Sequence, residues 1–169
     1  MLSLGISSPV NAYLTHNQNR SNEISVGKNE TTITEDFPDI TPIPYTDNPT
    51  IQKVVRVYSS NDPDNVDCYV RVRVLESNSA YGNAMEYCDL DTANWTYNAY
   101  DDFYYYHHIL SPGEETTPLF TAIKVLGAEV DPEEAEKLQH VWIDVYEESI
   151  QAGEYTSYQD AWNAMSVSE

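Results

Sequence analysis

Positively charged residues are scarce in this chain. Its 169 residues include 8 Lys and Arg against 28 Asp and Glu, which gives a formal net charge of −20 at pH 7. A surface of that sign repels phosphate backbones and anionic lipid headgroups. We therefore expect no nucleic-acid partner and no attachment to an acidic membrane surface.

Long apolar stretches and glycines are scarce as well. No stretch approaches the roughly 18 consecutive apolar residues of a membrane-spanning helix, so we expect no membrane span. With six glycines in all, the chain has no glycine-rich phosphate loop and no Gly-x-Ser-x-Gly nucleophile motif. We expect no enzyme activity and no cofactor.

The chain has two cysteines, Cys68 and Cys88. One disulfide between them would suit an exported protein, although sequence alone does not show that they meet. Cys68 shares its face of an expected strand with valines, so a buried free thiol is the alternative.

The first twelve residues, MLSLGISSPVNA, are small and apolar. Val10 and Ala12 occupy the −3 and −1 positions that a signal peptidase favours, although the charged region that usually precedes them is missing. We interpret residues 1–12 as a signal-peptide remnant or a disordered leader. Residues 13–167 are long enough to form a single domain with a core of its own.

Period-two alternation is the dominant pattern. In residues 67–76 (DCYVRVRVLE), cysteine and valines alternate with tyrosine and arginines, which predicts a strand with one dry and one wet face. Residues 51–59 form its expected hairpin partner, because turn-forming residues separate the two. Regular short strands of this kind predict an all-β antiparallel sandwich. Further strands are expected at residues 23–26, 31–35, 103–110, 119–126 and 140–149.

Two short helices are also expected. Residues 131–138 (DPEEAEKL) begin with Asp131 as an N-cap. Residues 156–165 (TSYQDAWNAM) begin with Thr156 and place apolar residues at i, i+3, i+4 and i+7. The second helix, close to the C-terminus, should lay its apolar face on the sandwich. A helical turn is expected around residues 82–87.

The adjacent histidines His107 and His108 invite a metal interpretation. Neighbours on a strand point to opposite faces, so two adjacent histidines do not readily bind one ion. His16 and His140 add no local motif. We therefore expect no metal site at these histidines.

Acidic loops are the remaining cation candidates. In an EF-hand that began at Asp62, the sixth position would need Gly and the twelfth Glu, but Asp67 and Arg73 stand there. We interpret this loop, which also contains Asp64, as a solvated turn. Weak calcium binding stays open for it and for a second acidic loop, which contains Glu86, Asp89 and Asp91.

Four segments share motifs with one family, in that family's order. They are NAYLTHNQNRSNEISVGKNETTITE, KVVRVYSSNDPDNVDCYVRVRV, YYYHHILSPGEETTPLFTAIKV and VYEESIQAGEYTSYQDAWNAM. The chain thereby resembles camelysin and the TasA-like exported proteins, in particular the clostridial-type members, over nearly all of residues 12–167. In the first segment the matching residues are Ala12, Tyr13, Thr15, Asn22, Ile24, Val26 and Gly27.

The chain departs from this family at two places. The turn before the Tyr-Val-Arg-Val motif has Asp-Pro-Asp-Asn where a glycine-containing turn is usual. His107 and His108 stand where lysines are common, so any role of those lysines does not carry over to this chain.

The resemblance implies a jelly-roll-like β-sandwich that is exported through a SipW-type signal peptidase in Gram-positive bacteria. It implies a secreted structural protein whose partner is a second copy of itself, assembled into extracellular biofilm matrix fibres, with an anchoring or nucleating accessory protein. In such fibres an N-terminal segment of one subunit completes the sheet of the next.

The N-terminal residues favour strand donation on physical grounds too. A polar leader precedes a short apolar strand at residues 23–26 that has few local partners, and such strands add to open sheet edges. The alternative is that residues 23–26 pair within their own domain. Our candidates for the donor strand are Tyr13, Leu14, Ile24 and Val26.

Two other functions remain as alternatives. Camelysin-type proteins have been described as surface metallopeptidases, but zinc requires at least three converging ligands and no spacing here supplies them. A monomeric surface-binding module is the other, because 14 tyrosines offer a contact surface.

Overall fold

The computed structural model describes residues 15–17, 29–36, 48–76, 85–126 and 143–166. Within these ranges the chain forms ten strands and one helix. The strands are β1 (Thr15–Asn17), β2 (Thr31–Asp36), β3 (Thr50–Gln52), β4 (Val54–Ser59), β5 (Cys68–Glu76), β6 (Met85–Cys88), β7 (Trp95–Asn98), β8 (Phe103–Tyr106), β9 (Ala122–Val125) and β10 (Ile143–Gln151), and the helix is α2 (Tyr158–Ser166).

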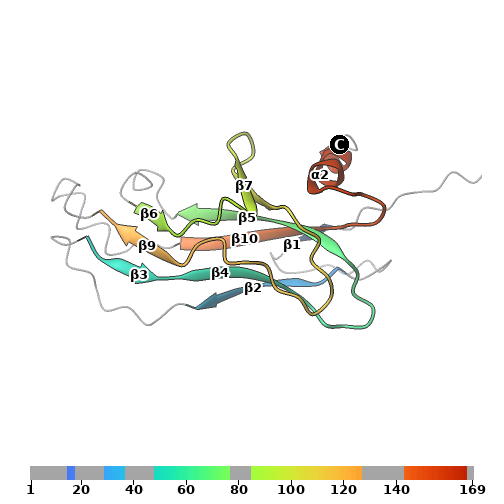
Figure 1. The fold of residues 1–169 in the computed structure, drawn as a ribbon, viewed down its shortest axis with the longest axis horizontal. Helices are drawn as coiled ribbons and strands as arrows, with labels where there is room; N and C mark the ends of the chain where they lie inside the picture. Colours follow the sequence, from blue (N-terminus) through green and yellow to red (C-terminus); the bar gives the residue numbers. More distant parts are fainter. Residues whose placement is uncertain (1–14, 18–28, 37–47, 77–84, 127–142, 167–169) are drawn as a thin grey trace, which may run out of the picture.

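The strands form two layers (Figure 1). The first layer is a five-stranded antiparallel sheet in the order β1-β10-β5-β8-β7. The second layer contains a two-stranded sheet, β2-β4, and a three-stranded sheet in the order β3-β9-β6. Backbone hydrogen bonds join its two parts, since the Leu119 amide donates to the Val55 carbonyl at 2.8 Å and the Lys53 amide to that of Thr121 at 3.1 Å. The predicted all-β antiparallel sandwich is confirmed.

The core between the layers is aliphatic and aromatic. The inner face of β5 contributes Val70 and Val72, and the facing layer contributes Val57, Phe120 and other side chains of the same cluster. All four are completely buried. Strands with β-branched residues on one face form such a layer because those side chains pack well on a pleated surface.

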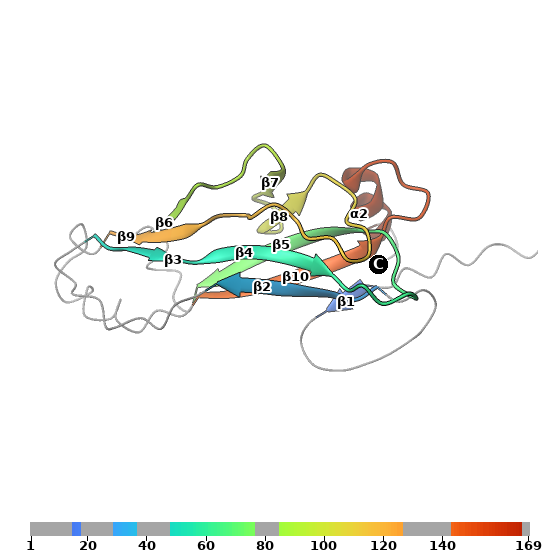
Figure 2. The same cartoon turned by 60° about the horizontal axis from the view of Figure 1, so that its bottom comes forward.

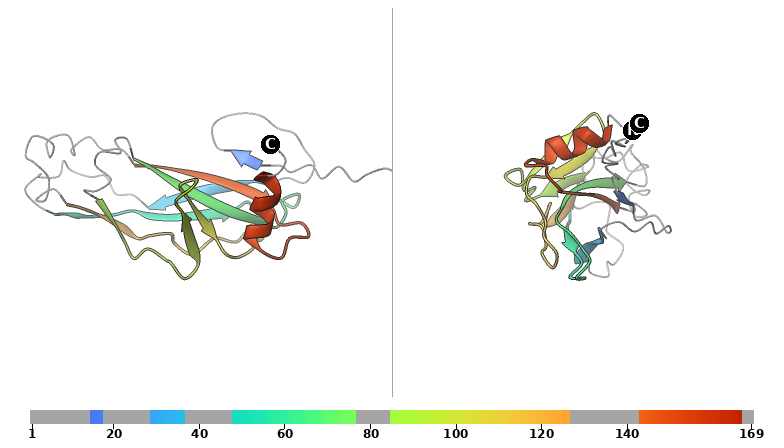
Figure 3. Two further views of the ribbon diagram at one scale, coloured as in Figure 1. Left: turned by 90° about the horizontal axis from the view of Figure 1, so that it is seen from above. Right: turned by 90° about the vertical axis from the view of Figure 1, so that its right-hand side faces the viewer.

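The face of β5 that was predicted to be wet is instead largely covered. Tyr69 is buried there, in a second cluster with Phe103 and Ile150 and with Ala161 and Trp162 of α2. Seen end-on, α2 lies outside the five-stranded sheet, on the side away from β2 and β4 (Figure 3). The prediction that the C-terminal helix packs its apolar face on the sandwich is confirmed.

The hairpin predicted over residues 51–76 is wrong. β4 pairs with β2 and β5 pairs with β10 and β8, so the two predicted partners lie in different layers. The linker is a real turn, in which the Asn65 amide donates to the Asp62 carbonyl at 3.0 Å. It carries the chain across the sandwich rather than back along the same sheet.

Several element boundaries also differ from the predictions. β8 ends at Tyr106, and Leu110 forms only an isolated bridge with Cys68. The expected helical turn around residues 82–87 is wrong where it is described, because Met85–Cys88 is strand β6. The helix cap is Ser157 instead of Thr156, since the Asp160 amide donates to the Ser157 hydroxyl at 3.2 Å.

Three predictions lie outside the described residues. They are the leader at residues 1–12, the strand at 23–26 and the helix at 131–138.

Candidate functional site

The edge of the five-stranded sheet is formed by β10 and the very short β1 (Figure 2). β1 covers three of the nine residues of β10, with Thr15 opposite Ile150, His16 opposite Ser149 and Asn17 opposite Glu148. On its other side β10 pairs with β5 along its whole length. Among the described residues, the pairing of β1 with β10 is thus confined to residues 148–150 of β10.

The predicted donor-strand residues Tyr13, Leu14, Ile24 and Val26 lie outside the described residues. The described pairing of β1 with β10 begins at Thr15, directly after Leu14.

A buried acid lies behind this edge. Glu147 of β10 is completely buried, as are Thr31 of β2 and Ser149 of β10. The Thr31 hydroxyl is 2.8 Å and 3.0 Å from the two carboxyl oxygens of Glu147, and 3.0 Å from the Ser149 hydroxyl. We call these three residues the polar triad. It links the two layers at the side where β1 is attached.

The environment of Glu147 favours its neutral form. Burial raises the pKa of Glu147 to about 7, the hydrogen bond from Thr31 opposes that rise, and the neighbouring charge of Glu148 adds to it. No cation faces Glu147 among the described residues, so the hydrogen bond from the Thr31 hydroxyl is what opposes the effect of burial on its carboxyl group. A buried carboxyl in that setting takes up a proton near neutral pH.

Sequence reasoning missed Glu147, although one signal pointed to it. The alternation that places Ile143 and Val145 on one face of the strand also places residues 147 and 149 on that face. The Glu-Glu-Ser run disguised the pattern, because acidic residues are rarely buried without a counter-charge.

On the opposite face, Glu148 belongs to an ion-pair network. Its carboxylate accepts from the Arg71 Nε at 2.7 Å, and the Arg71 guanidinium also donates to the Tyr105 hydroxyl at 2.9 Å. The guanidinium carbon lies 4.1 Å from the Phe103 ring centre and 4.2 Å from that of Trp162. These contacts connect β5, β8, β10 and α2, which gives the network a structural role.

The two adjacent histidines make separate contacts. His107 lies 2.7 Å from the Thr96 hydroxyl and stacks on Tyr158, whereas His108 lies 3.0 Å from the Asn94 side chain. Both come after the end of β8, so the expectation that they lie on a strand is wrong.

The acidic loops use their carboxylates to hold turns. Asp62 accepts from the Asp64 amide at 2.9 Å, and Asp89 accepts from the Thr121 hydroxyl at 2.6 Å. Hydrogen bonds from Asn94 and Thr117 lower the pKa of Asp91 below its ordinary value.

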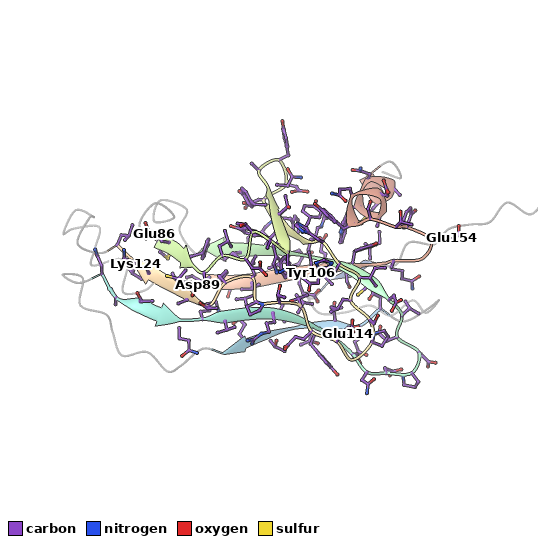
Figure 4. All side chains as sticks on the ribbon, viewed as in Figure 1. Glu86, Asp89, Tyr106, Glu114, Lys124 and Glu154 are labelled. Carbon is purple, nitrogen blue, oxygen red and sulfur yellow. The ribbon has the colours of Figure 1, made fainter. Side chains whose placement is uncertain are left out.

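Two of the labelled acids, Glu86 and Glu154, lie at opposite ends of the described structure (Figure 4). Glu86 lies beside Lys124, 3.5 Å from its ammonium group, at one end of the molecule, and Glu154 lies at the other. No group of three or more His, Cys, Asp or Glu residues in the described ranges is arranged to hold a metal ion.

Cys68 and Cys88 are free cysteines in the structure, so it does not contain the candidate disulfide. Cys68 is buried in the core, which agrees with the alternative of a free thiol. Burial raises the pKa of the Cys68 thiol to about 12, and the charges of Glu147 and Asp67 act in the same direction.

Two exposed tyrosines lie on β7 and on the loop between β7 and β8, which projects from the body of the molecule (Figure 1). Tyr100 at this loop is fully exposed and Tyr97 is 48% exposed. The Tyr97 hydroxyl donates to Asp102 at 2.7 Å, which holds one ring against the hairpin.

No family model, curated protein or solved structure matches this chain. In the part of the chain that the structure describes, no helix has the length and apolar character needed to cross a bilayer.

Proposed function

We propose that the chain is a secreted structural protein of a Gram-positive bacterial surface and a subunit of extracellular biofilm matrix fibres. Subunits join when the N-terminal strand of one copy pairs with β10 of the next. The observation that carries this proposal is the β10 edge, where β1 pairs with three of nine residues.

The β10 edge has the properties of an acceptor for an added strand. Backbone N–H and C=O groups along a sheet edge pair readily with another extended chain, and a longer strand forms more such bonds than a short one. The three residues of β1 supply few of them. The same segment from a second copy can make the same pairs, which is the general route of strand exchange between identical subunits.

The resemblance of the sequence to the camelysin and TasA-like proteins supports the same function. The resemblance implies the export route and the assembly into fibres. The sandwich architecture agrees with the fold that the resemblance implies. The net charge of −20 suits a protein that must stay soluble until it assembles.

Electron microscopy of the purified protein tests the proposal. We expect fibres from the full chain and none from a chain that lacks residues 12–27. Circular dichroism must show that the shortened chain keeps its β-sheet signal. If both forms remain free of fibres at every concentration, the proposal fails.

A matched pair of point variants at His16 gives a finer test. His16 lies opposite Ser149 in the register, and proline removes a backbone donor and disfavours paired strand, whereas alanine does neither. We expect His16→Pro to abolish fibres and His16→Ala to retain them. Equal fibre formation by the two variants would show that β1 pairing is not needed.

A second candidate function is a monomeric surface-binding module. The full exposure of Tyr100 and the half-exposed ring of Tyr97 favour it, because tyrosines are frequent anchors of protein contacts. A full chain that stays monomeric, and whose binding to a cell surface is lost in Tyr100→Ala, would support this function over the fibre. No observation on the described residues favours the metallopeptidase alternative.

A further inference from the structure

The inner face of β10 changes character along its length. Ile143 and Val145 pack against the apolar core, whereas the next two inward positions are Glu147 and Ser149 of the polar triad. A strand added to this edge therefore meets an apolar half and a polar half. The change occurs beside β1, whose last residue, Asn17, lies opposite Glu148.

The register of an added strand determines which of its side chains lie beside the apolar half of β10 and which lie beside the polar half. Residues directly opposite each other in an antiparallel pair share a face of the sheet. A slip by one residue exchanges the two faces of the added strand, and a slip by two moves every side chain to a new neighbour. An edge with only apolar residues, such as Ile143 and Val145, accepts several registers with similar energy.

The polar triad removes that freedom. All three contacts within the triad run through the single Thr31 hydroxyl, so the carboxyl of Glu147 and the hydroxyl of Ser149 keep further hydrogen-bonding capacity. Covering that capacity with an apolar side chain costs free energy, so a strand that brings a polar residue to the triad pairs more favourably. Single buried polar residues are known to select one register among apolar alternatives in this way.

We propose that Glu147, Thr31 and Ser149 fix the register in which the N-terminal strand of a second copy of this chain pairs with β10. The occupant follows from β1, because the chain's own N-terminal strand already pairs beside the triad, with His16 opposite Ser149. An identical copy presents the identical strand. The inference rests on the proposed function in one respect, namely that the added strand comes from a second copy. The geometry of the triad comes from the structure itself.

Cysteine cross-linking measures the register. The acceptor cysteine is placed at Glu148, in a background with Cys88→Ser, since Cys68 is buried. Every cysteine pair then lacks the contact of Glu148 with Arg71 alike, so differences among the pairs report the donor position. The donor cysteine is placed in turn at Thr15, His16 or Asn17. The observed register predicts that Asn17→Cys cross-links to Glu148→Cys at least tenfold faster than the other two.

The decisive comparison introduces Glu147→Leu into the three cysteine pairs. Thr31 and Ser149 can still hydrogen-bond to each other at 3.0 Å, so the sandwich should fold. We expect the preference for Asn17 to fall to within about twofold of the other positions, because an apolar inner face tolerates slippage. Asp144→Leu is the matched control, since Asp144 is exposed on the same strand, and it should keep the tenfold preference.

Two results would overturn the inference. One is an unchanged preference in Glu147→Leu, and the other is equal cross-linking at all three positions when Glu147 is present. Glu147→Gln, which retains hydrogen bonding in the core, should keep the preference.

Non-reducing gel electrophoresis of the cross-linked samples distinguishes a failure of this inference from a failure of the proposed function. Cross-linked dimers and larger species show that the strand comes from another copy, whereas cross-links within monomers show that it stays in its own chain. A preference for Asn17 that depends on Glu147 but occurs only within monomers would support the triad and contradict the fibre.

Discussion

The two faces of the five-stranded sheet place neighbouring acidic side chains in opposite environments. On the outer face, under α2, Glu148 is bound by Arg71, whose guanidinium lies between the rings of Phe103 and Trp162. On the inner face, one residue away along β10, Glu147 is completely buried and bonded to the Thr31 hydroxyl. Of these two neighbouring residues, Glu148 therefore forms an ion pair on one face, whereas Glu147 on the other face has a pKa near neutral pH.

The comparison shows why the two faces should respond to different changes. The ion pair on the outer face depends on the geometry of the guanidinium group and of the rings that it contacts. The inner face depends on close packing and on whether one proton is bound.

Phe120→Ala should give the largest effect. Phe120 is completely buried in the inner core and stacks on Tyr87 with ring centres 4.8 Å apart. We expect the free energy of unfolding to fall by about 4 kcal/mol, because removing a large buried ring leaves a cavity. Urea denaturation measures it. A loss below about 1 kcal/mol would show that the inner core is loosely packed and that the two faces differ less than described.

The dependence of stability on pH should give the second-largest effect. The folded-state pKa of Glu147, about 7, is higher than its ordinary value of 4.5, so the folded chain binds a proton that the unfolded chain has lost. The free energy of unfolding that this proton contributes is complete below pH 4.5 and is lost as the pH rises through about 7. The expected loss is on the order of 3 kcal/mol, because each unit of difference in pKa corresponds to about 1.4 kcal/mol.

Glu147→Gln isolates this contribution from the repulsion among the other acids. The variant should lack the part of the pH dependence that lies between pH 4.5 and 7, whereas Asp144→Asn, which changes an exposed carboxylate, should keep it. Urea midpoints at several pH values measure the difference. Parallel curves for Glu147→Gln and the unaltered chain would mean that Glu147 is ionised in the fold like a surface acid.

Arg71→Lys should give the smallest effect, on the outer face. Lysine keeps the charge but loses the planar contacts with Phe103 and Trp162, so we expect the free energy of unfolding to fall by about 1 kcal/mol. Tyr100→Ala is the control, because that ring is fully exposed and should change stability by less than about 0.5 kcal/mol. Indistinguishable stabilities of the two variants would show that ring contacts do not hold the outer face.

Local patterns were enough to predict the strands and the C-terminal helix, but not how the strands pair. The alternation around Val70 and Val72 correctly placed β5 and its inner face. The turn before it was also correct, yet it joins strands of different layers. Turn residues show where a chain reverses, whereas the choice of partner depends on the packing of segments distant in sequence.

The burial of Glu147 could not be predicted from local sequence patterns for the same reason. Its partner, Thr31, is 116 residues away, and the second covering of β5 comes from α2 at the other end of the chain. The face that carries Tyr69 and Arg71 looked wet because alternation identifies two faces but does not say how many layers a sheet will have.

The contrast between the two cysteines makes the protein convenient for spectroscopy. Cys68 is sealed in the core with a pKa of about 12, and Cys88 is partly accessible on β6. Since thiolates and not thiols attack maleimides, a fluorophore or spin label added to the native chain near neutral pH should attach at Cys88 alone. The unmutated protein thus carries its own single reporter position on the layer that faces away from α2.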